Sequence, residues 1–484
     1  MPRNRESAVQ TKVVQVAFGL VLLGIVAFAT KSMMFGSTMI AKILAAGIVG
    51  ATVVFALDKR YWLISAFLFG FYGTIPYIKF TGAELGALIL VSVFFVRMSL
   101  RRDHHVSGVN SIVLSTIPFL SWMCVVWAMN PVGMFIFGSS SIGGRFYFKV
   151  ILAFLSMCCL STLLLDERES KYLALAVVFG YLARALYSVI FGDVEEAFWG
   201  TRSHYAFIPV TYAAPIFLCR FSAPELLSRV GPFVGFSVLF LLGFWAGNRT
   251  GASRPVLVGL LAPVFLRKDR IKTLFLILAA SFVLAIVVLG HGSAWRLPFA
   301  AQRALSFLPG KWDRRLEAYG FHDNFRATLR MYAREHIKEN PWFGDGGFSL
   351  DLNEVAWTNA RNAYGDTFSG HVVGRNWHNV WLGMAADFGI PLSVAWALFM
   401  AVLLVSGWRE ARRMPLGTWH QTAFLYFYLL IVVEFVSFFF AGGHTARTAE
   451  QIFLWTGMML AVRNGVPVPT RVLEPFTDGR WNRR

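Results

Sequence analysis

Long apolar stretches alternate with short polar segments along most of the 484-residue chain. A helix needs about 20 apolar residues to cross a bilayer, whereas the strands of a membrane barrel are shorter and alternate in polarity. The pattern therefore predicts an all-α polytopic membrane protein with about 12–14 transmembrane helices. The candidate spans lie near residues 13–30, 39–57, 61–76, 82–97, 111–129, 146–164, 171–191, 204–219, 231–246, 255–267, 272–290, 379–407, 420–440 and 450–462.

One polar segment, residues 291–377, is far longer than the other connections. Within it, "NFRATLRMYAREHIKENPWFGDGG" has the pattern of a helix that stops before Pro341 and is followed by a glycine turn. A connection of this length is expected to be functional. The predicted domains are an N-terminal transmembrane bundle (1–290), a mainly helical loop domain (291–377), C-terminal transmembrane helices (378–462) and a basic tail (463–484).

The distribution of Lys and Arg predicts the orientation in the membrane. If the N-terminus is cytoplasmic, most of the loop Lys and Arg fall on the cytoplasmic side, as the positive-inside rule requires. Both termini are then cytoplasmic, and residues 291–377 face the periplasm. Cytoplasmic anchoring also accounts for most of the net charge of +18, without a nucleic-acid partner.

Charged residues inside a bilayer are costly and usually mark a functional site. Four of them fall in the outer half of predicted spans: Lys149, Arg184, Asp387 and Glu434. Their shared depth indicates one polar cavity that opens on the outer side. The alternative for any single residue is an ion pair between helices.

Cationic side chains in the predicted outer turns would add to this cavity. Arg249 and Arg254 lie in "GNRTGASRP", and His444 and Arg447 lie in "AGGHTARTAE". Because arginine is the exception on the outer side, we expect at least one of Arg249 and Arg254 to bind an anion.

Neither a metal nor another cofactor is expected. His371 and His378 are seven residues apart, and no close cluster of His and carboxylates has the spacing of a metal site. The stretch "GDGGF" lacks the Lys-Ser/Thr of a P-loop, which argues against ATP hydrolysis.

Three stretches resemble the O-antigen ligase and polymerase superfamily of bacterial surface-polysaccharide enzymes. "TGASRPVLVGLLAPV" (250–264) is similar to the Ser-Arg opening of a family helix, with Ser253 and Arg254 as the pair. "RATLRMYAREHIKENPWFGDGGF" (326–348) resembles the arginine-led helix and Pro-x-x-Gly-x-Gly turn of the large periplasmic loop. "HNVWLGMAADFGIP" (378–391) resembles the His-Asn-x-x-Leu motif.

The resemblance implies a metal-independent glycosyltransferase of the bacterial inner membrane. Its donor would be a glycan on undecaprenyl diphosphate, transferred as a block to a glycan or lipid A-core acceptor at the periplasmic face. Membrane lipids and a polysaccharide export assembly are the other expected partners. A lipid A-core ligase, a repeat-unit polymerase and a ligase onto protein all share this donor chemistry, and the length of the chain and its extra spans favour a polymerase or an exopolysaccharide-type enzyme.

The chemistry of the transfer assigns expected roles to individual residues. His378 would accept the proton of the acceptor hydroxyl or orient it, since a neutral imidazole in reach contributes about 10²–10⁴-fold. Arg254, with Arg249 in reserve, would bind the diphosphate through bidentate hydrogen bonds, and Arg330 would supply a second cation. Further residues expected around the substrate are Arg184, Arg375, Asn379, His444 and Arg447, with Asp387 or Glu434 orienting the histidine or an arginine.

A transporter or flippase of a lipid-linked or anionic substrate is the alternative function. It too would have many spans, outward-facing cations and carboxylates inside the membrane. The long segment 291–377 and the lack of a repeated pair of interrupted helices favour the enzyme.

Overall fold

The part of the chain that the structure describes is helical. The computed structural model describes residues 60–71, 80–99, 110–129, 144–191, 203–245, 249–306, 308, 310–313, 321–346, 377–440 and 445–467. Within these ranges no strand is formed, and His291 and Trp295 make an isolated β-bridge. The predicted spans 13–30 and 39–57 lie outside the described residues.

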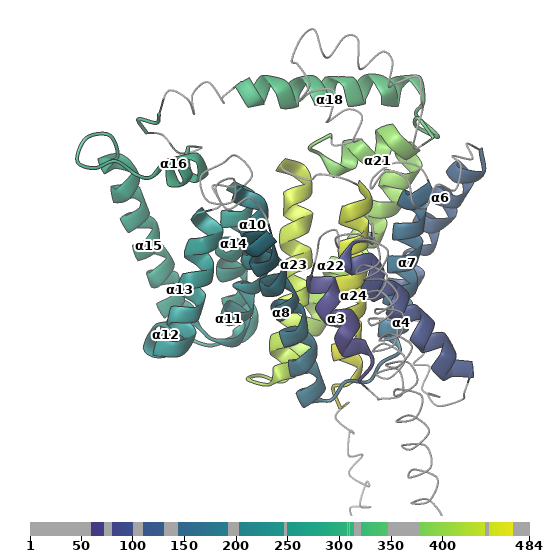
Figure 1. The fold of residues 1–484 in the computed structure, drawn as a ribbon, viewed down its shortest axis with the longest axis horizontal. Helices are drawn as coiled ribbons and strands as arrows, with labels where there is room; N and C mark the ends of the chain where they lie inside the picture. The colour runs from purple at the N-terminus through teal and green to yellow at the C-terminus, as the bar shows by residue number, and fades with distance from the viewer. Residues whose placement is uncertain are drawn as a thin grey trace, which may run out of the picture.

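The helices keep the labels of Figure 1. Their bounds are α3 (Trp62–Gly70), α4 (Gly82–Ser99), α5 (Ser111–Leu114), α6 (Ile117–Met129), α7 (Gly144–Ser161), α8 (Glu167–Phe191), α10 (Ser203–Ala213), α11 (Pro215–Arg220), α12 (Ala223–Ser228), α13 (Val230–Trp245), α14 (Arg249–Leu266), α15 (Arg270–Gly290), α16 (Phe299–Leu305), α18 (Phe321–Glu339), α21 (Val380–Phe388), α22 (Ile390–Arg413), α23 (Trp419–Phe440) and α24 (Thr445–Asn464).

Five helical segments of the described residues are long and apolar enough to cross a membrane. They are residues 111–129, which include α5 and α6, and the helices α8, α15, α22 and α23. Shorter apolar helices occur in α7, α13 and α14. These findings support the prediction of a helical, multi-pass membrane protein.

Local sequence signals explain where several helices begin. Ahead of α4, the Thr81 backbone N–H donates to Glu84 (2.6 Å) and the Glu84 N–H donates to the Thr81 hydroxyl (3.1 Å), which is a capping box. The side chain of Asn110 caps α5 by accepting from the backbone N–H of Ile112. These caps satisfy backbone donors that the first turn of a helix leaves without a partner.

Helix α23 lies in the centre of the bundle and α15 lies at its edge (Figure 1). In the apolar stretch of α23, 78% of the residues are buried, against 11% for α15. Helices α8, α11, α14, α22 and α24 pack against α23 and share its hydrophobic core. The outward residues of α15 are large and apolar, as a helix that faces lipid requires.

Helix α18 lies across one end of the bundle, over α21, and α16 lies at the same end (Figure 1). Leu329 and Ala333 on its buried face are fully buried, and Ala333 packs in a small cluster with Trp377 and Ala386. The segment 291–377 thus contributes a helix that packs on the rest of the fold through one apolar stripe.

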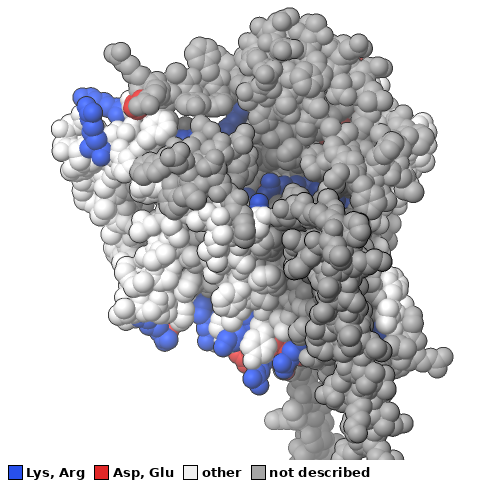
Figure 2. Space-filling view, in the orientation of Figure 1, with Lys and Arg blue, Asp and Glu red and all other residues white. Residues whose placement is uncertain are grey.

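Lys and Arg side chains gather along the lower edge of Figure 2, at the opposite end from α18. This edge includes the connection between α14 and α15, where Arg267, Lys268, Arg270 and Lys272 follow one another closely. Other Lys and Arg side chains are visible well above this edge on the same face (Figure 2).

Three details of the predicted spans are wrong. The stretch 379–407 is two helices, because the chain turns at Gly389, where φ is +88°. The stretch 204–219 divides into α10 and α11 ahead of Pro215, which begins the second helix. The segment from Arg249 to Arg254 is no turn but the start of α14. Hydropathy records only polarity, so it misses each of these backbone details.

Candidate functional site

A buried ion pair joins α14 to α23. Nη2 of Arg254 lies 2.6 Å from Oε2 of Glu434, and each side chain is 9% exposed. The Arg254 guanidinium also lies over the ring of Tyr212 on α10, 4.2 Å from its centroid. Since the guanidinium face binds the ring while its edge binds the carboxylate, the orientation of Arg254 is fixed from two directions.

Aromatic packing holds Tyr212 in place. Its ring stacks on Tyr181 of α8 with centroids 4.9 Å apart, and Trp455 of α24 lies 5.9 Å away. The hydroxyl of Tyr426 on α23 donates to the backbone carbonyl of Tyr212 (2.9 Å). Arg254 therefore sits on a wall to which α8, α10, α23 and α24 all contribute.

Two further arginines give this region an excess of positive charge. Arg447 on α24 interacts electrostatically with Tyr212 and with Arg184 on α8. Arg184 is half-buried, with its guanidinium over the rings of Phe71 and Tyr187, whereas Arg447 is exposed. Arg184, Arg254 and Arg447 are three cations against the carboxylates of Glu434 and of Glu450, which is buried on α24 one turn from Arg447, and the remaining positive charge suits a bound anion. We call Arg184, Arg254, Arg447 and Glu434 the arginine cluster.

One buried donor of the arginine cluster, Nε of Arg254, has no hydrogen-bond acceptor among the described residues. Gln451 on α24 interacts with the neighbouring Tyr212 through its side chain. A buried donor without an acceptor costs about 1–3 kcal/mol. A bound anion would supply acceptors for such groups.

His378 lies at the start of α21 in an uncommon backbone conformation. Its φ is +51°, in the left-handed region that few residues other than glycine adopt. Asn379, which follows it, caps α21 because its side-chain oxygen accepts from the backbone N–H of Leu382 (3.0 Å). That oxygen is thus occupied by a helix cap rather than presented to a substrate.

Trp377 anchors this turn from the other side. It is 1% exposed, and its indole N–H donates to Oδ1 of Asp387 (3.2 Å). The ring of His336 on α18 lies 6.0 Å from the Trp377 ring, and Nδ1 of His336 lies 3.3 Å from Oδ1 of Asp345. Asp387 therefore acts on the position of His378 through the neighbouring Trp377.

The second and third motifs of the sequence pack directly against each other. The backbone N–H of Asp345 donates to Ala386 O (2.9 Å), and the N–H of Ile390 donates to Pro341 O (2.8 Å). The approach is so close that a Cβ on Gly389 would lie 1.8 Å from the carbonyl oxygen of Trp342. Residues 341–346 and 386–390, which we call the latch, thus join the end of α18 to the α21–α22 turn.

Helix α21 packs against α24, which carries Arg447 of the arginine cluster. Gly383 on α21 faces Thr445 at the start of α24, where a Cβ on Gly383 would lie 3.2 Å from the Thr445 hydroxyl. Arg447 follows Thr445 within the first turn of that helix. The helix that begins next to His378 therefore packs on the helix that carries part of the arginine cluster.

The other residues named from the sequence fall elsewhere or outside the described part. Lys149 pairs with Glu84 on α4 (3.5 Å). For this residue the alternative named above, an ion pair between helices, is the one that the structure has. Arg330 is exposed on α18, and its Nε donates to the Arg326 carbonyl (3.2 Å), away from the arginine cluster's contacts. The side chain of Arg249 and the residues Arg375 and His444 lie outside what is described.

Sequence reasoning missed Tyr212, Trp377, Gln451 and the His336–Asp345 pair. Tyr212 and Trp377 have the pattern of ordinary buried aromatic residues, and Gln451 and His336 that of polar positions on helices. Polarity alone therefore marks none of them as part of a site. Among the described residues, no group of three or more His, Cys, Asp or Glu is arranged to hold a metal ion.

No protein-family model matches the chain, and no curated protein is similar to it. The resemblance to the O-antigen ligase and polymerase superfamily therefore rests on the motifs themselves.

Proposed function

We propose that the chain is a membrane glycosyltransferase of the bacterial inner membrane that uses a glycan on a polyprenyl diphosphate as donor. The observation that carries the proposal is the arginine cluster, in which Arg254 is buried between Glu434 and Tyr212 with an unsatisfied Nε donor. A diphosphate is a dianion or more, and fixed guanidinium groups bind it through paired hydrogen bonds.

In the proposed reaction, the acceptor hydroxyl oxygen attacks the anomeric carbon of the donor sugar. The bond from this carbon to the diphosphate oxygen breaks, and the polyprenyl diphosphate leaves with the electron pair. Arg254 and Arg447 stabilise the charge that develops on the leaving oxygen. The hydroxyl proton passes to a neutral His378, whose turn is anchored by Trp377 and Asp387.

The latch gives α18 a role in this proposal. Because residues 341–346 bind the α21–α22 turn, α18 covers the end of the bundle next to His378. An acceptor glycan that reached His378 from the periplasm would pass this helix. Acceptor choice, and hence polymerase or ligase activity, would then depend on α18 and the segment around it.

The experiment is electrophoresis of surface polysaccharide from a strain that lacks the gene, complemented with wild type, His378→Asn or Arg254→Lys. Asparagine tolerates the left-handed backbone at position 378 but lacks a basic ring nitrogen. Loss of long chains with accumulation of single lipid-linked units would indicate a polymerase. Polymer left on the lipid diphosphate with bare acceptor would indicate a ligase.

Two results would refute the proposal that the protein is a glycosyltransferase. An unchanged glycan profile in the deletion strain would remove the proposed substrate. Substrate accumulating on the cytoplasmic face of the membrane, with normal transfer by both variants, would instead point to a transporter or flippase.

A further inference from the structure

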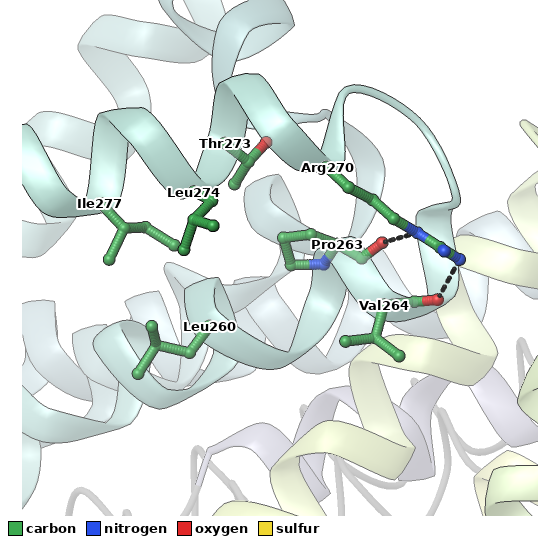
Figure 3. A pocket seen from close by; sticks show the side chains of 7 residues that line it. All are labelled: Leu260, Pro263, Val264, Arg270, Thr273, Leu274 and Ile277. Carbon is green, nitrogen blue, oxygen red and sulfur yellow. Dashed lines mark hydrogen bonds between the residues drawn. The ribbon is translucent and has the colours of Figure 1, made fainter.

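A cavity of about 230 Å³ lies between the C-terminal half of α14 and α15, at the end of the bundle opposite α18. Figure 3 shows the apolar side chains of Leu260, Leu274 and Ile277 on its two sides. Leu260 and Leu274 are 45% and 56% exposed, so the cavity opens on the outer surface of the bundle. Its mainly apolar lining suits a hydrocarbon chain.

The cavity exists because α15 separates from α14 soon after their connection. Arg267 and Asp269, with φ of +55° and +50°, reverse the chain in a tight turn between the two helices. Pro263 in the last turns of α14 removes a backbone donor and leaves a bulky ring at the cavity. Few residues of α15 are buried by the protein, so its attachment to the bundle is weak.

Arg270 lies at the mouth of the cavity. Its Nε donates to the carbonyl oxygen of Pro263 (3.3 Å) and its Nη2 to that of Val264 (3.0 Å), as Figure 3 shows. Arginine has five N–H donors, so these two bonds leave others to bind a further acceptor. The side chain is exposed and is held in this position by the end of α14.

The mouth carries more positive than negative charge. Lys268 and Arg229 both pair with Glu225 on α12 (3.3 and 2.8 Å), and Lys272 pairs with Asp269 (3.6 Å). With Arg267 and Arg270 the local set is five cations and two carboxylates. Basic residues beside a gap between transmembrane helices attract anionic lipid headgroups.

We propose that this cavity binds one anionic phospholipid. One acyl chain lies between Leu260 and Ile277, and the headgroup phosphate accepts hydrogen bonds from Arg270. The lipid would supply the contacts that the protein does not make between α14 and α15. Because a ligand stabilises the state that binds it, the lipid raises the stability of the assembled helices.

The test is native mass spectrometry and thermal unfolding of the full-length protein in a neutral detergent. The protein is titrated with phosphatidylglycerol and, separately, with phosphatidylcholine that carries the same acyl chains. We expect one phosphatidylglycerol to be retained and to raise the unfolding temperature, with phosphatidylcholine bound about fivefold more weakly. Equal retention of the two lipids would overturn the proposal, as would an equal effect of glycerol phosphate without chains.

Variants separate the headgroup from the chain. Arg270→Gln should weaken phosphatidylglycerol about fivefold and leave phosphatidylcholine unchanged. Arg168→Gln, an exposed cation on α8 at the same end of the bundle, is the matched control and should change neither lipid.

A second pair of variants tests the cavity itself. Leu260→Trp fills it and should abolish retention of the lipid, whereas Leu278→Trp, exposed on α15 outside the cavity, should not. Retention unchanged in Leu260→Trp would overturn the proposed position of the chain. Both variants keep an apolar residue on a lipid-facing surface, so neither should prevent insertion.

Discussion

Replacing Glu434 with glutamine leaves the guanidinium of Arg254 buried without its carboxylate. The two groups are 2.6 Å apart and each side chain is 9% exposed, so solvent screens the pair little. At an effective dielectric constant of about 20, their attraction is about 6 kcal/mol. Desolvation of the two ions offsets most of this attraction, but removal of one partner typically costs about 3–5 kcal/mol.

The expected loss in Glu434→Gln is therefore about 3–5 kcal/mol in the free energy of unfolding. Arg254→Met in the same protein should recover at least half of that loss, because no buried charge then remains. The cation–π contact with the Tyr212 ring stabilises a desolvated guanidinium by about 2 kcal/mol. Arg254 keeps this contact in Glu434→Gln.

The assay is a double-mutant cycle of unfolding in lipid nanodiscs, with the wild type, both single variants and the double variant. Lys149→Met provides a comparison, since it breaks a buried pair whose atoms are 3.5 Å apart. A loss below about 1 kcal/mol in Glu434→Gln would refute the reasoning, because an exposed pair contributes no more than that. Additive effects in the double variant would also refute it, because the cycle would then show no coupling.

Three further predictions concern the latch and the residues near it. His378→Asn should lower transfer about 10²–10⁴-fold with unchanged folding, and activity within a few-fold of wild type in a purified assay would exclude His378 as the base. Gly389→Ala should destabilise by more than the roughly 1–3 kcal/mol that a strained backbone of positive φ costs alanine, because its Cβ meets Trp342 O. Gly417→Ala, at φ +74° in open space, is the matched control, and equal losses of unfolding free energy would contradict the clash. Arg330→Ala and Arg334→Ala, both exposed on α18, should affect transfer equally, and a selective loss at position 330 would show that Arg330 contacts the substrate.

The sequence by itself determined the class of the protein and the positions of most helices. Runs of apolar residues are a local property, and a bilayer leaves a helix as the only way for a single apolar run to satisfy its backbone groups. The same local reasoning marked Glu434 and Asp387, because a charge inside an apolar run is visible without any knowledge of its neighbours. Arg254 was marked as a cation of a predicted outer turn, where arginine is the exception.

The tertiary structure decided which of these charges meet and how the helices are interrupted. Arg254 and Glu434 are 180 residues apart, and their contact depends on the packing of α14 against α23. The division at Gly389 depends on the latch, since the turn is bonded to residues 341–346 from another part of the chain. Hydropathy and periodicity are sums over neighbouring positions, whereas partners and strained turns are set by the side chains that distant segments bring together.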